Sequence, residues 1–244
     1  MSSLNDIPIS ALNFYLTAPY PCSYLPDRQA RSQVATPAFL IDTQLYSGLM
    51  QHGFRRSGTY IYRPRCDDCD ACVQMRVSAQ RFRASRSQRR AYLRHANLEA
   101  SLHPLLDKGE YFELYRRYQK SRHPDGGMAD DDRESYKTFL LQSQIDTLLV
   151  EFREQGELRM VSVIDLVKDG LSSVYTFYDP DLPGASLGVY NVLWQIELCR
   201  KLDLDYVYLG YWIADCRKMS YKTRYQPAEG LFDGAWRPLQ GDRA

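Results

Sequence analysis

The chain has 244 residues, 44% of them hydrophobic and 25% charged, and its formal net charge is +1. These values are ordinary for a globular protein with a buried core, and the small net charge gives no overall sign of a nucleic-acid-binding protein. No apolar run is long enough to cross a membrane, and the opening Met-Ser-Ser-Leu-Asn-Asp lacks the pattern of a secretory signal. We therefore expect a cytoplasmic protein with no membrane partner.

The sequence predicts little regular structure before residue 42, then one helix and two extended segments up to residue 83. Residues 1–36 are rich in proline, and we expect them to be irregular. Asp42 is a good N-cap for a helix that ends at Gly53. Residues 58–64 predict a strand, and residues 73–83 are expected to be extended.

Three helices are predicted in the middle of the chain. The first is capped by Ser85 or Ser87 and runs to about Leu102. The second fits residues 109–122, where tyrosines and leucine recur at helical spacing. The third fits residues 132–143.

The C-terminal part has the clearest order of elements. Residues 145–152 predict a strand, and two β-rich runs, 158–167 and 171–178, are joined by a Lys-Asp-Gly turn typical of a hairpin. An apolar helical stripe over residues 189–199 and a strand over residues 206–213 follow. This order resembles the core of the N-acetyltransferase-like acyltransferase fold, in which the central strands splay beside the helix. We therefore predict an α+β protein with that fold.

The six cysteines are too few for a disulfide-dense scaffold, but three of them are clustered. The run Arg65-Cys66-Asp-Asp-Cys69-Asp-Ala-Cys72 contains two overlapping C-x-x-C spacings. Three thiolates at this spacing can bind a zinc ion or an iron–sulfur cluster, and Cys22 is the candidate fourth ligand. The alternative is a reduced, partly buried loop without metal. A metal at this place would be structural.

Basic residues are concentrated between residues 71 and 98, where no Asp or Glu occurs. Arg86, Arg90 and Arg94 recur at i, i+4 and i+8, so one helix face carries several guanidinium groups that repel one another. A polyanion explains such clustering better than stability does, although acidic partners from other segments are the alternative. The candidate phosphate-binding residues are Arg81, Arg83, Arg86, Arg89, Arg90 and Arg94.

Three further residues have both a chemical and a structural interpretation. His123, at the end of a tyrosine-rich helix, can transfer a proton, hold a carboxylate, or bond the last helix carbonyls. Asp165 lies in an apolar strand, so it needs a partner or a chemical task unless it faces water. Gly188 opens a helix and marks a candidate backbone-amide site. The glycine-rich pyrophosphate loop of coenzyme-A acetyltransferases is absent from this segment, which argues against acetyl-CoA as donor.

Long stretches of the chain together carry a resemblance to one family. They lie at residues 22–28, 53–64, 82–90, 114–123, 170–180, 186–190, 210–213 and 218–222. In this order they resemble the arginyl-tRNA–protein transferases and their shorter bacterial relatives, the aspartate/glutamate leucyltransferases. The arginyl branch opens with a C-x-x-C pair, whereas Leu25 stands here in place of the second cysteine. This departure and the short length favour the leucyl branch and leave metal binding open.

The resemblance implies an N-terminal cysteine-containing module, residues 1–84, and an N-acetyltransferase-like aminoacyl-transferase domain, residues 85–244. It implies a donor, leucyl-tRNA, and acceptor proteins that begin with Asp or Glu and are thereby marked for degradation. It implies no coenzyme A. Two other classes remain: a metal-stapled tRNA-binding module without catalysis and a small-molecule N-acetyltransferase. An arginyl-tRNA donor is the alternative within the family.

An aminoacyl ester is already activated, so the chemistry requires no cofactor. The enzyme has to hold the acceptor amine roughly 3 Å from the ester carbonyl and stabilise the oxyanion. We expect Asp165 or His123 to accept the proton or orient the amine. Backbone amides near Gly188 are candidates for the oxyanion.

Both substrates need binding residues. A bidentate arginine suits the acceptor's acidic side chain best, so Arg76 is the first candidate there, with Lys222 and His123 behind it. The candidates for positioning the donor are Ser172, Ser173, Tyr175, Tyr178, Gly188 and Tyr190.

Overall fold

The computed structural model describes residues 8–122, 124, 130–182 and 184–240. Its centre is an eight-stranded sheet in a mixed α and β fold. The strands follow one another across the sheet in the order β14 (Ala235–Leu239), β13 (Ala228–Phe232), β7 (Val73–Ser78), β12 (Tyr206–Trp212), β11 (Gly170–Tyr178), β10 (Glu157–Val167), β9 (Thr147–Glu154) and β8 (Glu99–His103).

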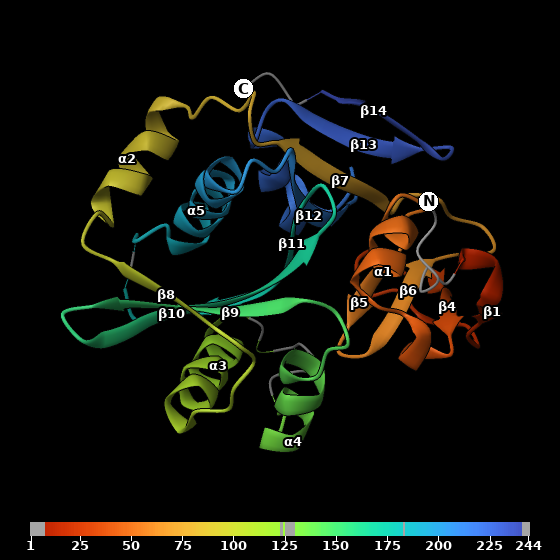
Figure 1. The fold of residues 1–244 in the computed structure, drawn as a ribbon, viewed down its shortest axis with the longest axis horizontal. Helices are drawn as coiled ribbons and strands as arrows, with labels where there is room; N and C mark the ends of the chain where they lie inside the picture. Colours follow the sequence, from red (N-terminus) through yellow and green to blue (C-terminus); the bar gives the residue numbers. More distant parts are fainter. Residues whose placement is uncertain (1–7, 123, 125–129, 183, 241–244) are drawn as a thin grey trace, which may run out of the picture.

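Helices cover both faces of this sheet, as Figure 1 shows. On one face α5 (Leu187–Lys201) and α2 (Arg86–Arg94) enclose the largest hydrophobic cluster, which includes Ile164 and Ile196. On the other face α3 (Gly109–Arg122), α4 (Arg133–Tyr136) and the π-helical turn Lys137–Leu141 enclose a second, aromatic cluster. Because both faces are covered, central strands such as β10 are apolar along most of their length.

A smaller sheet lies beside the first one and carries the N-terminal residues (Figure 1). Its order is β1 (Asn13–Leu16), β4 (Ser32–Thr36), β6 (Tyr60–Pro64) and β5 (Arg55–Ser57). Helix α1 (Thr43–Met50) packs its buried side chains against this sheet and against Tyr208 of the large sheet. The remaining short elements are η1 (Ile9–Ala11), β2 (Tyr20–Pro21), β3 (Gln29–Ala30), η2 (Ala38–Leu40) and η4 (Arg217–Arg224).

Several local signals have the predicted effect. The Asp42 side chain accepts a hydrogen bond from the Leu45 N–H at 2.9 Å and starts α1. Ser85 and Gln88 form a reciprocal capping box at the start of α2. The hairpin of β10 and β11 and the second helix of the middle segment, α3, are confirmed.

Two expectations about the elements are wrong. Residues 1–36 are not irregular throughout, because β1 and β4 pair with each other and β4 pairs with β6. The helix that begins after Ser85 ends at Arg94 instead of Leu102. Residues 99–103 form β8 and pair with β9, so pairing with a distant segment overrides the local helical pattern.

Strands β11 and β12 run parallel and are joined through α5. They pair over only three residues, Gly170–Ser172 with Tyr206–Tyr208, although both strands continue well beyond this point. The register of β11 against β10 shifts between Val163 and Ile164 of β10, and that of β12 against β7 shifts between Tyr208 and Gly210 of β12. The two central strands therefore diverge beside α5, and we call the region between residues 173–178 and 209–212 the strand divergence.

Strand β7, which precedes the predicted boundary at residue 84, is part of the large sheet and pairs with β12 and β13. The division of the chain at residue 84 stays a prediction. Within the part of the chain that the structure describes, no helix has the length and apolarity needed to cross a membrane.

Candidate active site

The guanidinium of Arg55 spans the strand divergence. Its Nη2 atom donates a hydrogen bond of 2.7 Å to the Ser173 carbonyl of β11. Its Nη1 atom lies against Gly210 of β12, where a Cβ would come within 2.4 Å of it. Gly210 has a φ of 81°, so both the backbone conformation and the approach of Arg55 require glycine here.

Lys222 of η4 lies at the same place. Its Nζ donates a hydrogen bond to the Tyr211 carbonyl, one residue after Gly210. The side chain is buried, and burial together with the charge of Arg55 lowers the pKa of Lys222 to about 7. Lys222, a candidate for binding the acceptor, therefore lies beside Arg55, which the sequence analysis did not select.

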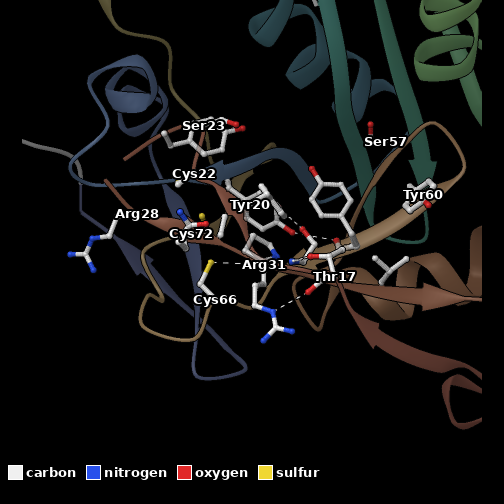
Figure 2. Close-up of a pocket in the computed structure, with 18 of the residues that line it drawn as sticks. Thr17, Tyr20, Cys22, Ser23, Arg28, Arg31, Ser57, Tyr60, Cys66 and Cys72 are labelled. Carbon is white, nitrogen blue, oxygen red and sulfur yellow. Dashed lines mark hydrogen bonds between the residues drawn. The ribbon is translucent and has the colours of Figure 1, made fainter. Parts of the chain in front are cut away.

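A cavity of about 880 Å³ lies between the small sheet and the segment that contains α4 (Figure 2). The two cations do not line it, but each contacts or pairs with a residue that does, Arg55 with Tyr62 and Lys222 with Tyr211. Tyr24, Tyr62 and Tyr211 line it, and Tyr62 is the cross-strand neighbour of Arg55. Burial raises the pKa of each of these tyrosines, while the charge of Arg55 opposes the rise. The phenols therefore stay protonated. The Tyr211 hydroxyl already donates to the Gly53 carbonyl at 2.7 Å, whereas those of Tyr24 and Tyr62 can donate to a ligand.

All four cysteines proposed as metal ligands line this cavity. Figure 2 shows Cys22, Cys66 and Cys72 on one side of it. Their thiols are free, and burial followed by the neighbouring thiols Cys66, Cys22 and Cys69 raises the pKa of Cys72 to about 12. No group of three or more such side chains in the described ranges is arranged to hold a metal ion. The four thiols thus line one cavity, and whether they bind a metal stays a prediction.

The candidate donor residues are not all in one place. Ser173 and Gly188 lie at the strand divergence, where the Tyr178 hydroxyl would be 3.9 Å from a Cβ on Gly188. Tyr175 is on the opposite face, and its hydroxyl accepts a hydrogen bond of 2.9 Å from Gln119. Tyr190 lies under α2 and stacks on the Tyr92 ring.

The remaining donor candidate, Ser172, is fully buried where β11 and β12 still pair. The strand divergence therefore gathers Ser173, Tyr178 and Gly188, and it leaves Tyr175 and Tyr190 in the helix-covered clusters on either side of the sheet.

Asp165 has the partner that a buried carboxylate needs. Its two oxygens accept hydrogen bonds of 2.7 and 2.8 Å from Arg56, and Thr147 donates a third at 2.7 Å. The carboxylate is 0% exposed and the Arg56 side chain is 1% exposed. These contacts favour a role in joining β5 to β10, and the expectation that Asp165 accepts a proton stays a prediction.

Arg76, the first candidate for reading the acceptor's acid, is already paired. Its Nε donates to Glu229 at 2.8 Å, its Nη1 lies 3.7 Å from Asp169, and its guanidinium is stacked 3.6 Å from the Tyr206 ring centroid. The same guanidinium lies 4.2 Å from the Trp236 ring centroid. With two carboxylates beside it, Arg76 is poorly suited to bind a third.

The arginine-rich segment is exposed and has few acidic partners. Arg81 lies 3.5 Å from Glu229, and this is the one ion pair with a carboxylate that the described residues give to the six candidates. Arg83, Arg89 and Arg94 donate to backbone carbonyls instead. Arg86 and Arg90 project from α2 into solvent. His123 lies outside the described residues.

One feature of the sequence could have indicated Arg55 as a site residue. Arg55 and Arg56 are consecutive in a short strand, so their side chains point to opposite faces, and both are buried. Two adjacent arginines that are both buried need either two buried anions, or one buried anion and one bound ligand. In the sequence, this segment stands out only through the family resemblance.

Comparisons with known proteins cover nearly the whole chain. Residues 20–90 match the family "Arginine-tRNA-protein transferase, N terminus", and residues 110–232 match "Arginine-tRNA-protein transferase, C terminus". A Nitrosospira multiformis protein named aspartate/glutamate leucyltransferase is 58% identical over 98% of this chain and 96% of its own length. A Chromobacterium violaceum protein of the same name is 56% identical over 95% of this chain and 96% of its own.

Among solved structures, that of L-PGS from Bacillus licheniformis superimposes with a TM-score of 0.48 and 12% identity, covering 71% of this chain and 61% of its own. The two proteins named aspartate/glutamate leucyltransferase are far more similar to this chain in sequence than this structure is. On the two family matches and on identities above 50% across almost the full length, this chain belongs to the arginine-tRNA-protein transferase family.

Proposed function

We propose that this protein transfers leucine from leucyl-tRNA to the N-terminal Asp or Glu of acceptor proteins, and so marks them for degradation. The observation that carries the proposal is the identity of 58% and 56%, over nearly the whole chain, with two proteins named aspartate/glutamate leucyltransferase. Because the identity extends over both family regions, it includes the parts of the chain that would bind donor and acceptor.

The large sheet supports the same reaction type. A hairpin, a connecting helix and a parallel strand that diverges from its neighbour follow one another in β10, β11, α5 and β12. We propose that this is the N-acetyltransferase-like acyltransferase fold, with the aminoacyl ester held in the strand divergence near Tyr178 and Gly188. An aminoacyl ester needs no further activation, so neither coenzyme A nor another cofactor enters the reaction.

The acceptor amine has to lose a proton before it attacks the ester. An α-amino group has a reference pKa of about 8, so a part of it is already neutral near pH 7.5. A weak base is therefore sufficient. Because Asp165 is held by Arg56 and Thr147, His123 is the better of the two candidates for this role.

The exposed arginines of α2 are proposed to contact tRNA phosphates. Replacing Arg86, Arg89 and Arg90 by Gln should weaken the binding of charged tRNA and flatten its dependence on salt, since each lost phosphate contact lowers the slope by about one. The measurement is tRNA affinity at several salt concentrations. The exposed Arg116 of α3, which is paired with Glu113, provides a matched control as Arg116→Gln. An unchanged salt slope in the triple variant would mean that these arginines are only a solvated helix face.

We propose a structural metal at the cysteines of the cavity. Cys22, Cys66, Cys69 and Cys72 would supply four thiolates to a zinc ion or an iron–sulfur cluster. Metal analysis should then give near-stoichiometric zinc or iron, and replacing Cys66, Cys69 and Cys72 by Ser should lower the unfolding temperature. The buried Cys199 of α5, replaced by Ala, separates loss of a core thiol from loss of a ligand. Metal-free protein with full activity and unchanged stability would favour a simple reduced loop.

The test of the function is a comparison of donors. Purified protein, a peptide that begins with Asp, and either leucyl-tRNA or arginyl-tRNA are incubated side by side. We expect much faster transfer from leucyl-tRNA. Preference for arginyl-tRNA would place the chain in the other branch of the family. Binding of tRNA without transfer to any peptide would favour a non-catalytic binding module.

A further inference from the structure

Arg55 and Lys222 are buried cations with no carboxylate partner in the described part of the chain. Arg55 is 8% exposed and Lys222 is 9% exposed. Among the described residues neither of them forms an ion pair, and the Nη1 atom of Arg55 has no hydrogen-bond partner. Burying a charge without a counter-charge is unfavourable, so both groups lower the free energy of unfolding of the protein.

The two cations occupy one place. Arg55 reaches it from β5 and Lys222 from η4, and both meet the backbone of consecutive residues, Gly210 and Tyr211, where β12 leaves β11. The pKa of Lys222 is lowered mainly by burial and also by repulsion from the charge of Arg55. Two converging positive groups with an unused N–H donor form a site for one anion.

The neighbouring arginine shows what a purely structural arrangement looks like. Arg56 points to the opposite side of β5 and is satisfied by Asp165, Thr147 and the Gly58 carbonyl. Among the residues that the structure describes, a carboxylate therefore pairs with one of the two adjacent buried arginines and none pairs with the other. This contrast favours a bound ligand as the partner of Arg55.

We infer that Arg55 and Lys222 bind the side-chain carboxylate of the acceptor's N-terminal Asp or Glu, an inference that rests on the function proposed above. The site lies at the strand divergence, the region in which we also propose that the ester binds, near Tyr178 and Gly188. Arg55 and Lys222, rather than Arg76, would then set the requirement for an acidic first residue.

The surroundings favour a carboxylate over a tRNA phosphate. Tyr62, the cross-strand neighbour of Arg55, lines the cavity of about 880 Å³ together with Tyr24 (Figure 2). Both phenols stay protonated and can donate to a carboxylate. The exposed arginines that suit a nucleic-acid backbone lie on α2, which packs over α5 instead. A cavity of this size admits the first residues of a peptide.

The test uses four peptides that differ only in their first residue: Asp, Glu, Asn or Gln. We expect Arg55→Gln and Lys222→Gln each to raise KM for the two acidic peptides and to narrow the kcat/KM ratio of Asp over Asn by at least about tenfold. Arg55→Lys and Lys222→Arg, which keep the charge, should restore part of the ratio. Matched controls are Arg63→Gln on the adjacent strand β6 and Lys218→Gln, an exposed lysine of η4.

Two further measurements keep the test decisive if a variant is unstable. Affinity for leucyl-tRNA should be unchanged in all variants, which shows that they are folded. A peptide with an N-acetylated Asp cannot accept leucine, but it should inhibit the wild-type protein competitively, and its Asn counterpart should not. If the variants lower kcat/KM for all four peptides equally, the cations act on the donor or the reacting carbonyl and the inference is wrong.

The same experiment distinguishes failure of the proposed function from failure of the assignment of Arg55 and Lys222. If wild-type protein transfers leucine to none of the peptides, the function itself is wrong. If it transfers leucine preferentially to Asp and Glu and this preference survives in Arg55→Gln and Lys222→Gln, then only the assignment of these two residues fails.

Discussion

Asp165→Asn should lower the free energy of unfolding by about 3–5 kcal/mol, because it leaves the guanidinium of Arg56 buried without its counter-charge. The ion pair is 1% and 0% exposed, so water cannot replace the lost carboxylate without opening the contact between β5 and β10. Chemical denaturation of wild-type and variant protein at pH 7 measures the effect.

The matched control for this prediction is the double variant Arg56→Met/Asp165→Leu. Replacing both charges by apolar side chains removes the unpaired charge, so this variant should recover most of the lost stability. Transfer of leucine per folded molecule is the second readout. If Asp165→Asn is as stable as the wild type but loses turnover, Asp165 is the proton acceptor and its role in joining the two sheets is minor.

Lys222→Met should make the protein more stable at and below pH 7 while impairing selection of acidic acceptors. Burial and the charge of Arg55 lower the pKa of Lys222 to about 7, against about 10.4 in an unfolded chain. Since one pKa unit corresponds to about 1.4 kcal/mol, holding this lysine costs up to a few kcal/mol. Removing it also loses the hydrogen bond to Tyr211, so a net gain on the order of 2 kcal/mol is expected.

The sign of the pH dependence follows from the lowered pKa. Between pH 7 and about 10 the unfolded chain binds a proton at Lys222 that the folded protein does not, so wild-type stability rises with pH in this window. The advantage of Lys222→Met is therefore full below pH 7 and disappears towards pH 10. Lys218→Met, an exposed control in the same element, should change stability by less than about 0.5 kcal/mol at any pH. Destabilisation by Lys222→Met across the whole range would show that the lysine has a structural task.

Signals that depend on neighbouring residues were the ones that the sequence could predict. The caps at Asp42 and Ser85, the hairpin turn and the apolar stripe of α5 all act within a few residues, and all of them appear in the structure. Strand β8 could not be predicted in this way. Its pairing partner β9 lies some fifty residues away, and its four exposed residues carry no clear alternation.

The candidate site shows the same limit. Charge and residue type selected Arg76, but its suitability depends on Glu229 and Asp169, which tertiary structure brings to it from distant strands and turns. Asp165 was correctly read as a carboxylate that needs a partner, yet the sequence did not say that the partner is Arg56. Arg55 and Lys222 are separated by most of the chain, so only the fold reveals that they meet at Gly210 and Tyr211.

The most direct test of the account is the mass of a peptide with N-terminal Asp after incubation with the purified protein and leucyl-tRNA. We predict a gain of one leucyl residue on its α-amine, a comparable gain for a peptide that begins with Glu, and a far smaller one for peptides that begin with Asn or Gln. No gain on the Asp peptide, or an equal gain on the Asn peptide, would contradict the account.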